Sequence, residues 1–213
     1  MKRTALIPLI ALSVVAFAAV PVSAQQNEVG IFMSVAQFES STFEDAEFGD
    51  EVSLDFEGEL GWGASYNRYF GEQFSLEFGA QQINSSSTVS FSSEPDFEFD
   101  FADVDLTTYT AIAQWHFGGS DAMFAPYIGG GIALVSGQGD LDDEILEPGE
   151  DGEVDFEGET SFVANAGLDL RFGGVAIFAD AKYVPYEAVE EGFEEDAIDL
   201  NPLVFAAGVK FRF

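Results

Sequence analysis

The C-terminal stretch from Leu203 to Phe213 alternates in character: apolar side chains occupy every second position, and small or basic ones lie between them. A period of two is typical of a β-strand with two different faces, and this stretch is long enough to cross an outer membrane at a tilt. One face would meet lipid and the other a polar lumen. Because the chain ends on an aromatic residue, we expect this strand to close a sheet on itself. The stretch therefore predicts a transmembrane β-barrel.

Residues 1–24 have the features of a cleaved export signal. A short basic start precedes an apolar run over residues 6–20, and Val22-Ser23-Ala24 supplies the small residues that a signal peptidase requires. The apolar run is short for a membrane-spanning helix, which argues against the alternative of an N-terminal anchor. There is no cysteine, so a disulfide scaffold and a lipid-anchored N-terminus are excluded. We expect residues 25–213 to form one outer-membrane domain in a Gram-negative cell.

The chain is strongly acidic, with 39 acidic against 7 basic residues and a formal net charge of -32. Such a surface repels nucleic acid and attracts cations, so no nucleic-acid partner is expected. Thirty of the acidic residues fall into four segments that contain no Lys or Arg, at 39–55, 84–105, 138–157 and 185–200. The negative charge is therefore expected in four long loops.

Eight alternating segments lie between and around these acidic segments. We predict strands at about 29–38, 56–66, 74–83, 106–117, 127–136, 156–172, 175–183 and 203–213. Short connections (68–73, 118–123 and 173–174) alternate with the four long acidic ones. An up-and-down barrel with short turns at one rim and long loops at the other has this arrangement, whereas a Greek-key sandwich would not sort its loops by length. The predicted fold class is all-β, an eight-stranded antiparallel up-and-down transmembrane β-barrel.

The polar face of the strands carries charges of both signs. Alternation alone also allows a soluble barrel with an apolar interior. The mixture of signs instead favours a narrow lumen closed by ion pairs, for which the candidates are Glu57, Glu59, Glu77, Asp169, Arg171, Asp180, Lys182, Lys210 and Arg212. Aromatic residues that include Trp62, Tyr66, Tyr69, Phe70, Trp115, Phe117, Tyr127, Phe172, Tyr183, Phe211 and Phe213 are expected to form an interfacial girdle near the short turns.

Three segments resemble the OmpW family of small outer-membrane proteins: Leu106–Phe117, Ala125–Ile132 and Asn201–Phe213. The resemblance implies an eight-stranded, porin-like barrel with a narrow, largely apolar channel that passes small hydrophobic compounds. It also implies that Phe213 is part of the C-terminal signal read by the barrel-assembly machinery. The charged lumen and the acidic loops predicted from the residues depart from this family pattern.

His116 is the single histidine of the chain. In a lipid-modifying outer-membrane enzyme it would be the general base, paired with a serine and a carboxylate. The sequence pattern does not complete such a triad, so we expect a hydrogen-bonded histidine near the rim. The prediction is a protein that is not an enzyme and that carries no cofactor.

The most acidic segment offers weak metal candidates at Asp140, Asp142, Asp143 and Glu144. Calcium binds clustered carboxylates on flexible loops, but the spacing is not that of an EF-hand. The alternative is a solvated acidic surface adapted to high salt. Two functions follow as hypotheses: a channel for small hydrophobic molecules, or a surface-interaction barrel whose loops contact divalent cations, lipopolysaccharide or a neighbouring surface. Outer-membrane lipid is the expected surrounding in both.

Overall fold

The computed structural model describes residues 27–38, 41–44, 51–91, 94–119, 122–141, 152–188, 198–199 and 201–213. The predicted export signal lies outside these residues. The strands are β1 (Asn27–Gln37), β2 (Ser41–Glu44), β3 (Glu51–Gly58), β4 (Leu60–Tyr69), β5 (Phe74–Phe91), β6 (Glu94–His116), β7 (Phe124–Leu141), β8 (Glu153–Phe172), β9 (Val175–Tyr183), β10 (Glu187–Ala188), β11 (Ile198–Asp199) and β12 (Leu203–Arg212). Within the described ranges, no helix is long and apolar enough to cross a membrane.

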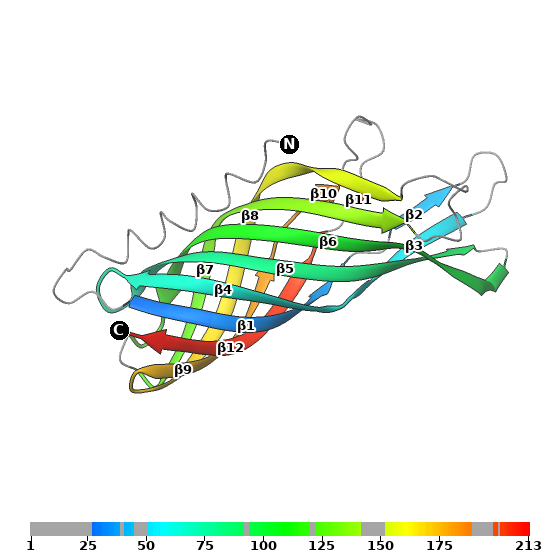
Figure 1. The fold of residues 1–213 in the computed structure, drawn as a ribbon. Coiled ribbons are helices and arrows are strands. Elements are labelled where there is room, and N and C mark those ends of the chain that lie inside the picture. Colours follow the sequence, from blue (N-terminus) through cyan, green and yellow to red (C-terminus); the bar gives the residue numbers. More distant parts are fainter. Residues whose placement is uncertain are drawn as a thin grey trace.

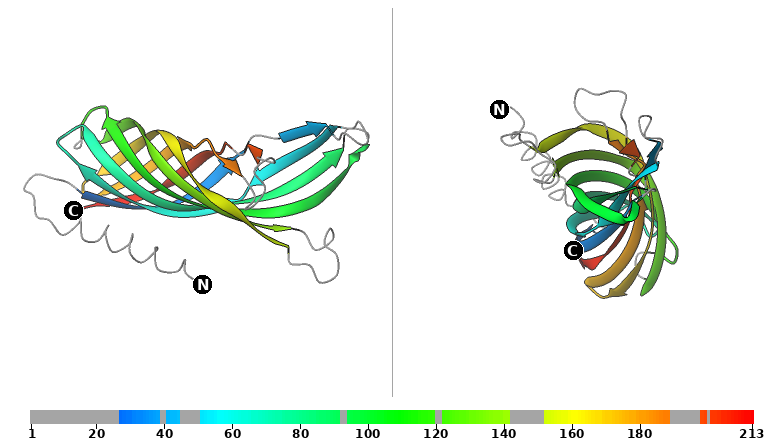
Figure 2. Two further views of the ribbon diagram at one scale, coloured as in Figure 1. Left: turned by 90° about the horizontal axis from the view of Figure 1, so that it is seen from above. Right: turned by 90° about the vertical axis from the view of Figure 1, so that its right-hand side faces the viewer.

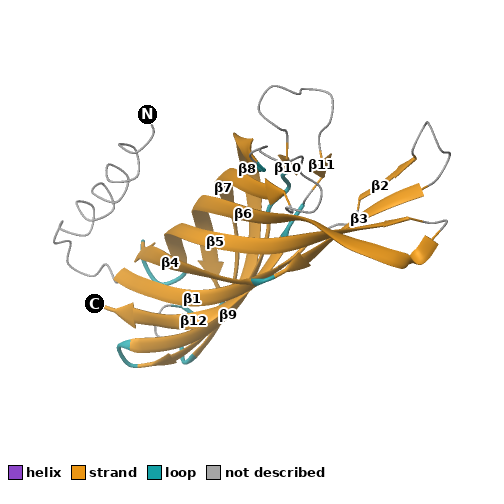
Figure 3. Cartoon of the chain, turned by 45° about the vertical axis from the view of Figure 1, so that its right-hand side comes forward, coloured by secondary structure: helices purple, strands orange, loops and turns teal. Residues whose placement is uncertain are grey.

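The strands close into a barrel (Figure 1). The first and last strands, β1 and β12, pair antiparallel from Glu28 opposite Arg212 to Gln37 opposite Leu203. β3 and β4 lie one after the other along β5 and together form one strand of the barrel wall. Each strand of the wall counted in this way is called here a stave, and eight antiparallel staves surround the interior. The predicted eight-stranded all-β barrel is confirmed. Figure 3 shows its wall as strand almost throughout.

The wall is much longer on one side than on the other (Figure 2). Strands β5 to β8 have 18, 23, 18 and 20 residues, whereas β9 and β12 have 9 and 10. The prediction that 84–105 is a connecting loop was wrong, because β5 continues to Phe91 and β6 starts at Glu94. The serine-rich run 85–87 carries no hydrophobic alternation, so the strand is visible in the backbone pairing and not in the sequence.

The outer face of the barrel is apolar. Side chains such as Ile31, Trp62 and Phe162 point outward and are more than half exposed, at 56%, 64% and 58%. A soluble barrel would bury this face, so the arrangement matches a barrel surrounded by lipid. The end that holds Asn27, Phe213 and the three short turns is called here the short-turn end, and the opposite end the long-loop end.

The predicted aromatic girdle is partly wrong. Phe70, Trp115, Phe117, Phe172, Phe211 and Phe213 are exposed at the short-turn end, as expected. Tyr69 and Tyr127 instead point inward and are 1% exposed. Tyr66 is buried and donates a hydrogen bond to Asn27 Oδ1 at 2.8 Å. Trp62 and Tyr183 lie toward the long-loop ends of their strands.

Candidate functional site

The barrel interior has two chemically different halves. Toward the short-turn end, polar and charged side chains from all eight staves form a cluster, called here the polar network: Glu28, Asn67, Tyr69, Ser75, Glu77, Gln114, His116, Tyr127, Asn165, Asp169, Arg171, Asp180, Lys182, Lys210 and Arg212. All except Arg212 are buried. They alternate with lipid-facing residues because successive side chains of a strand point to opposite faces.

Asp169 is the acceptor at the centre of the network. Its Oδ2 accepts a hydrogen bond from Arg171 Nη2 at 2.7 Å, and its Oδ1 accepts one from Lys210 Nζ at 2.9 Å. At the rim, Glu28 Oε1 accepts from Arg212 Nη2 at 2.6 Å and from Arg212 Nε at 3.0 Å. Arg171 Nε lies 4.0 Å from the same Glu28 oxygen and joins the two groups.

A second ion cluster forms around Lys182. Its ammonium donates to Asp180 Oδ2 at 2.8 Å and lies 3.7 Å from Glu77 Oε1. With the first cluster this makes four carboxylates and four basic groups. The network is therefore balanced in charge. Such balance is the condition under which buried charges are tolerated, since an unpaired one is very costly.

Aromatic rings cover the basic groups of the network. Lys210 Nζ lies 4.4 Å from the centroid of the Phe178 ring and 4.9 Å from that of Tyr127. Lys182 Nζ lies 5.3 Å from the Phe32 centroid. Cation–π attraction is strongest where the cation has lost its water, as here. Room for Tyr127 comes from Gly167, where a Cβ atom would approach the tyrosine ring to 2.5 Å.

Gln114 joins four staves through its amide group. Its Oε1 accepts from Asn67 Nδ2 at 2.8 Å, and its Nε2 donates to Glu77 Oε2 at 3.1 Å and to Asn165 Oδ1 at 3.0 Å. These partners come from β4, β5 and β8, while Gln114 belongs to β6. A network with this many shared members fixes the side chains across the lumen and leaves few alternative arrangements.

His116 lies between a serine and an arginine. Ser75 Oγ is 2.9 Å from Nε2, and Arg171 Nη2 is 3.4 Å from Nδ1. The guanidinium can only donate, so Nδ1 is the acceptor and the proton of the neutral ring sits on Nε2. His116 thus donates to Ser75 Oγ, which in turn donates to Gln114 Oε1 at 3.3 Å. A catalytic Ser–His pair needs the reverse polarity, with the ring accepting the serine proton.

Seven of the nine predicted lumen residues belong to the polar network: Glu77, Asp169, Arg171, Asp180, Lys182, Lys210 and Arg212. The predicted positions of Glu57 and Glu59 in the lumen are wrong, since both are exposed. Gly58 pairs with Ser85, whereas Trp62 pairs with Gln82, so one extra residue is inserted between these pairs. A single-residue shift reverses the face on which every preceding side chain lies, which moves Glu57 to the outside.

Sequence reasoning missed several members of the network. Glu28 lies one position before the predicted start of the first strand, although it continues the inward series of Gly30 and Phe32. Tyr69 and Tyr127 were assigned to the lipid interface because they are aromatic. Parity with Asn67 and Gly129 places them on the inner face. The alternation within the predicted strand 127–136 is enough to find Tyr127, and continuing it by one residue before 29 and by three residues after 66 finds Glu28 and Tyr69.

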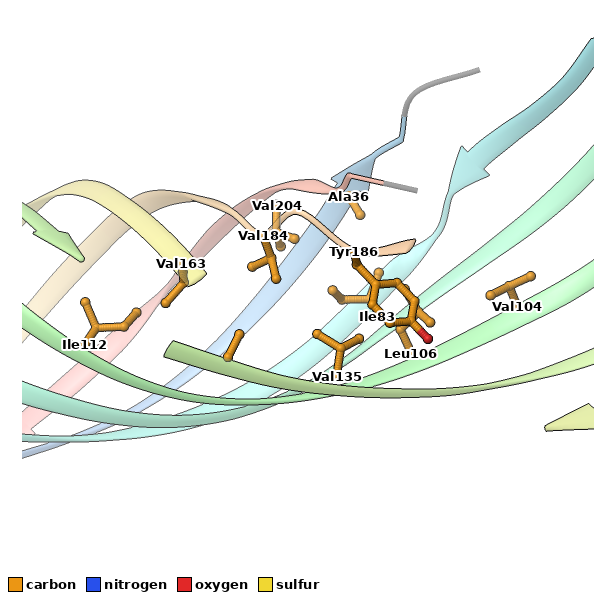
Figure 4. Close-up of a cluster of buried hydrophobic side chains, with 11 residues drawn as sticks. Ala36, Ile83, Val104, Leu106, Ile112, Val135, Val163, Val184, Tyr186 and Val204 are labelled. Atoms are coloured by element: carbon orange, nitrogen blue, oxygen red, sulfur yellow. The ribbon is translucent and has the colours of Figure 1, made fainter. Parts of the chain in front are cut away.

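Toward the long-loop end the interior contains a cluster of apolar side chains (Figure 4), although the same stretches of β5 and β6 also bury the polar side chains of Gln81, Ser85, Ser87, Thr108 and Thr110. The cluster, called here the apolar segment, consists of Ala36, Ile83, Val104, Leu106, Ile112, Ala133, Val135, Val163, Val184, Tyr186 and Val204, with Phe38 packed against it. Phe32, Phe178 and Ala206 form a smaller cluster. On β1 and β12 this cluster lies between the charged groups and the apolar segment, whereas on β9 the charged Asp180 and Lys182 lie between Phe178 and Val184. Tyr186 lies beyond β9, where burial and the Glu159 carboxylate raise its pKa to about 12.

No metal site is formed by the described part of the chain. Asp140 is exposed on β7, directly opposite Asp103 on β6 and Glu153 on β8. The other candidates, Asp142, Asp143 and Glu144, lie outside the described residues. The pairing of the exposed Asp103 and Asp140 is unfavourable by itself, because like charges directly opposite one another repel.

Comparison with known proteins points to one family. The model of the outer membrane protein beta-barrel domain matches residues 9–213. A search of curated sequences finds no match.

Solved structures share the fold at low sequence identity. OprG from Pseudomonas aeruginosa has a TM-score of 0.71 and 14% identity, over 89% of this chain and 96% of OprG. AlkL in lipid bilayers has a TM-score of 0.58 and 13% identity, over 92% and 93%. Ail, the attachment invasion locus protein of Yersinia pestis, solved with the heparin analogue sucrose octasulfate, has a TM-score of 0.51 and 13% identity, over 89% and 99%.

Proposed function

The chain belongs to the outer membrane protein beta-barrel family, and from this membership we propose that it is a narrow channel admitting small hydrophobic molecules from outside the cell. The protein lies in the outer membrane, where lipopolysaccharide slows the entry of apolar compounds. A barrel with an apolar entrance offers such compounds a route through this layer. Long loops of bacterial barrels face outward, so the apolar segment lies on the extracellular side.

The observation that carries the proposal is the apolar lining itself. Interiors of outer-membrane barrels are generally polar, and a polar lining admits water and ions. Here eleven residues of the interior form a buried hydrophobic cluster, which extends from Ile112, opposite Glu77, to Val104 near the long-loop end. An apolar solute would exchange water for contact with these side chains, a gain of about 25 cal/mol per Å² of apolar surface removed from water. The polar network beneath this segment would stop water and ions.

Uptake in intact cells tests the channel. Cells that express the protein should accumulate the apolar fluorescent probe N-phenyl-1-naphthylamine faster than cells without it. Ala133→Leu adds bulk to the apolar segment and should slow this uptake. Ala113→Leu makes the same change on the outer face of the neighbouring strand, where the residue is exposed to lipid, and should leave uptake unchanged. Equal uptake with and without the protein would refute the channel.

A second role, cation-bridged surface contact, is supported by the charge distribution. Residues 25–213 contain five basic residues, and four of them lie in the polar network. The fifth, Arg68, belongs to β4 at the short-turn end. A polyanion such as the heparin analogue bound by Ail would therefore be repelled at the long-loop end. Divalent cations would relieve the repulsion between the exposed carboxylates of Asp103 and Asp140 and link them to lipopolysaccharide phosphates. Calorimetric titration with Mg²⁺ should show binding that Asp103→Asn weakens.

We also infer that the protein is not an enzyme and needs no cofactor. The inference rests on the direction of the His116–Ser75 hydrogen bond, which leaves the serine without a base. Ester hydrolysis by the purified barrel that disappears in Ser75→Ala would refute it.

Phe213 is exposed beside the paired ends of β1 and β12, and we propose that the barrel-assembly machinery reads it there. Removal of Phe213 should then lower the yield of assembled barrel in cells.

A further inference from the structure

One inward-facing hydroxyl at the boundary between the two halves of the interior has no partner. Ser34 lies on β1 between Phe32 of the small aromatic cluster and Ala36 of the apolar segment. It is 3% exposed, and no described residue makes a hydrogen bond with its Oγ. A buried hydroxyl without a partner loses the hydrogen bonds that it would make in water, at a cost of about 1–3 kcal/mol. Such a group is a candidate for contact with a ligand.

The neighbours of Ser34 explain why its hydroxyl is unpaired. The residues opposite it are Gly61 on β4 and Ala206 on β12, and neither carries a polar side chain. Its Oγ lies over Gly61, at 3.0 Å from the position that a Cβ atom would take there. That Cβ would also lie 2.2 Å from the backbone oxygen of Gln82, so a larger residue does not fit at position 61. On both neighbouring strands the hydroxyl therefore faces only a methyl group or bare backbone, and no polar side chain.

The basic groups nearest the apolar segment are already engaged. Lys182 lies directly opposite Val204 of the apolar segment, but its ammonium is shared between Asp180 and Glu77. Lys210 donates to Asp169. A carboxylate that entered the apolar segment would lose its water without gaining a counter-charge, and the acidic exterior would repel it beforehand. The interior therefore disfavours the binding of anions.

We propose that Ser34 binds the hydroxyl group of a small neutral ligand, an aliphatic alcohol or a phenol, whose hydrocarbon part packs against the apolar segment. The serine hydroxyl both donates and accepts, as an alcohol does, so the two groups satisfy one another. This proposal rests on the proposed function, because it names the class of hydrophobic molecule that the channel prefers.

Ligands of equal chain length test the preference. The mature protein in phospholipid nanodiscs is dialysed against radiolabelled hexane, 1-hexanol, hexanoate or hexylamine at pH 8, with empty nanodiscs as the blank. One added hydrogen bond should make 1-hexanol bind roughly threefold to tenfold more tightly than hexane. Hexanoate should bind at least tenfold more weakly than 1-hexanol. Hexylamine, an ammonium at this pH, should also bind more weakly, since its charge would be buried.

A pair of serine variants assigns the preference to one residue. Ser34→Ala should bring the hexanol and hexane affinities together while hexane binding stays as it was. Ser85→Ala is the control, because this inward hydroxyl is also buried but already donates to the Glu57 carbonyl oxygen at 3.0 Å. It should keep the preference for 1-hexanol.

The outcomes separate this proposal from the proposed function. Binding of hexane without any preference for 1-hexanol would overturn the assignment to Ser34 and leave the hydrophobic channel intact. A preference that survives in Ser34→Ala, or hexanoate binding equal to that of 1-hexanol, would also overturn it. Binding of none of the four ligands would contradict both.

Discussion

The polar network has members on all eight staves, whereas the apolar segment comes from β1, β5 to β8, β12 and the residues after β9, and the two are held together by different forces. The network depends on directional contacts, such as the two hydrogen bonds that Asp169 accepts from Arg171 and Lys210. The apolar segment depends on the removal of aliphatic side chains from water, which has no preferred direction. The network should therefore be intolerant of any single change, whereas the apolar segment should accept substitutions of similar volume.

The two regions also differ in function: the polar network keeps the lumen rigid, and the apolar segment provides the surface for ligands. Buried ion pairs add little net stability over apolar packing of the same volume, yet losing one member is costly. A balanced network at the short-turn end thus fixes one arrangement of the lumen. The apolar segment has no such constraint and offers apolar ligands a favourable surface.

Removal of the Asp169 carboxylate should have the largest effect on stability. Asp169→Leu leaves Arg171 and Lys210 buried without their shared partner, and we expect a loss of about 3–5 kcal/mol in the free energy of unfolding. Urea unfolding of the protein folded in vesicles measures it, with folded and unfolded forms separated by gel mobility.

Two further variants sharpen this test. Asp140→Asn removes an exposed carboxylate and should change the free energy of unfolding by less than about 0.5 kcal/mol. A double variant, Asp169→Leu with Lys210→Met, removes a cation together with its acceptor and should recover part of the loss. Equal unfolding midpoints for Asp169→Leu and the wild type would contradict the central position of this residue.

A methyl group at Gly167 should have the next largest effect. The new Cβ would meet Tyr127 at 2.5 Å and Asp180 Cβ at 2.6 Å, so the ring must leave its position over Lys210. Overpacking of this kind costs about 1–3 kcal/mol. Gly130→Ala is the matched control, since Gly130 is exposed on the lipid-facing side and the atom nearest to its new Cβ, the Val163 backbone oxygen, would lie at 3.7 Å. Similar unfolding midpoints for the two variants would refute the tight contact.

The apolar segment should respond less. Ile83→Val removes one methylene group from a residue that is 2% exposed, and we expect a loss of about 0.5–1.5 kcal/mol. The same urea experiment measures it beside Asp169→Leu. A loss from Ile83→Val as large as that from Asp169→Leu would remove the distinction between the two halves.

The sequence was sufficient for the barrel and for most of the charged residues in its lumen. Period-two alternation identifies which residues share a face, and this placed Asp169, Lys182 and Lys210 together. It did not identify the extra residue between Gly58 and Trp62, which reverses the face of Glu57. Insertions of this kind depend on the pairing register between strands, and a single strand carries no signal for the register.

The division of the interior into two halves was also beyond the sequence. Val163 and Asp169 both point inward from β8, and the alternation treats them alike. Their surroundings differ because the strands are tilted and staggered around the barrel, so the neighbours across the lumen are set by the closure of the sheet. The partners of His116, and the absence of a partner for the Ser34 hydroxyl among the described residues, follow from the same closure.

The smallest expected effect is a dependence of stability on alkaline pH at the edge of the apolar segment. Burial and the Glu159 carboxylate hold the pKa of Tyr186 at about 12 in the folded protein, above the ordinary tyrosine value of 10.0. Between these two values the unfolded chain loses the phenolic proton and the folded chain keeps it, so stability falls as the pH rises. Below pH 10 the phenol is protonated in both states, so the folded protein keeps the full stability that the protonated Tyr186 gives it. Tyr186→Phe has no proton to lose, so its free energy of unfolding should decline less steeply than that of the wild type over this interval. Parallel declines in urea unfolding series from pH 9 to pH 12 would show that Tyr186 is exposed to water and does not belong to the buried apolar segment.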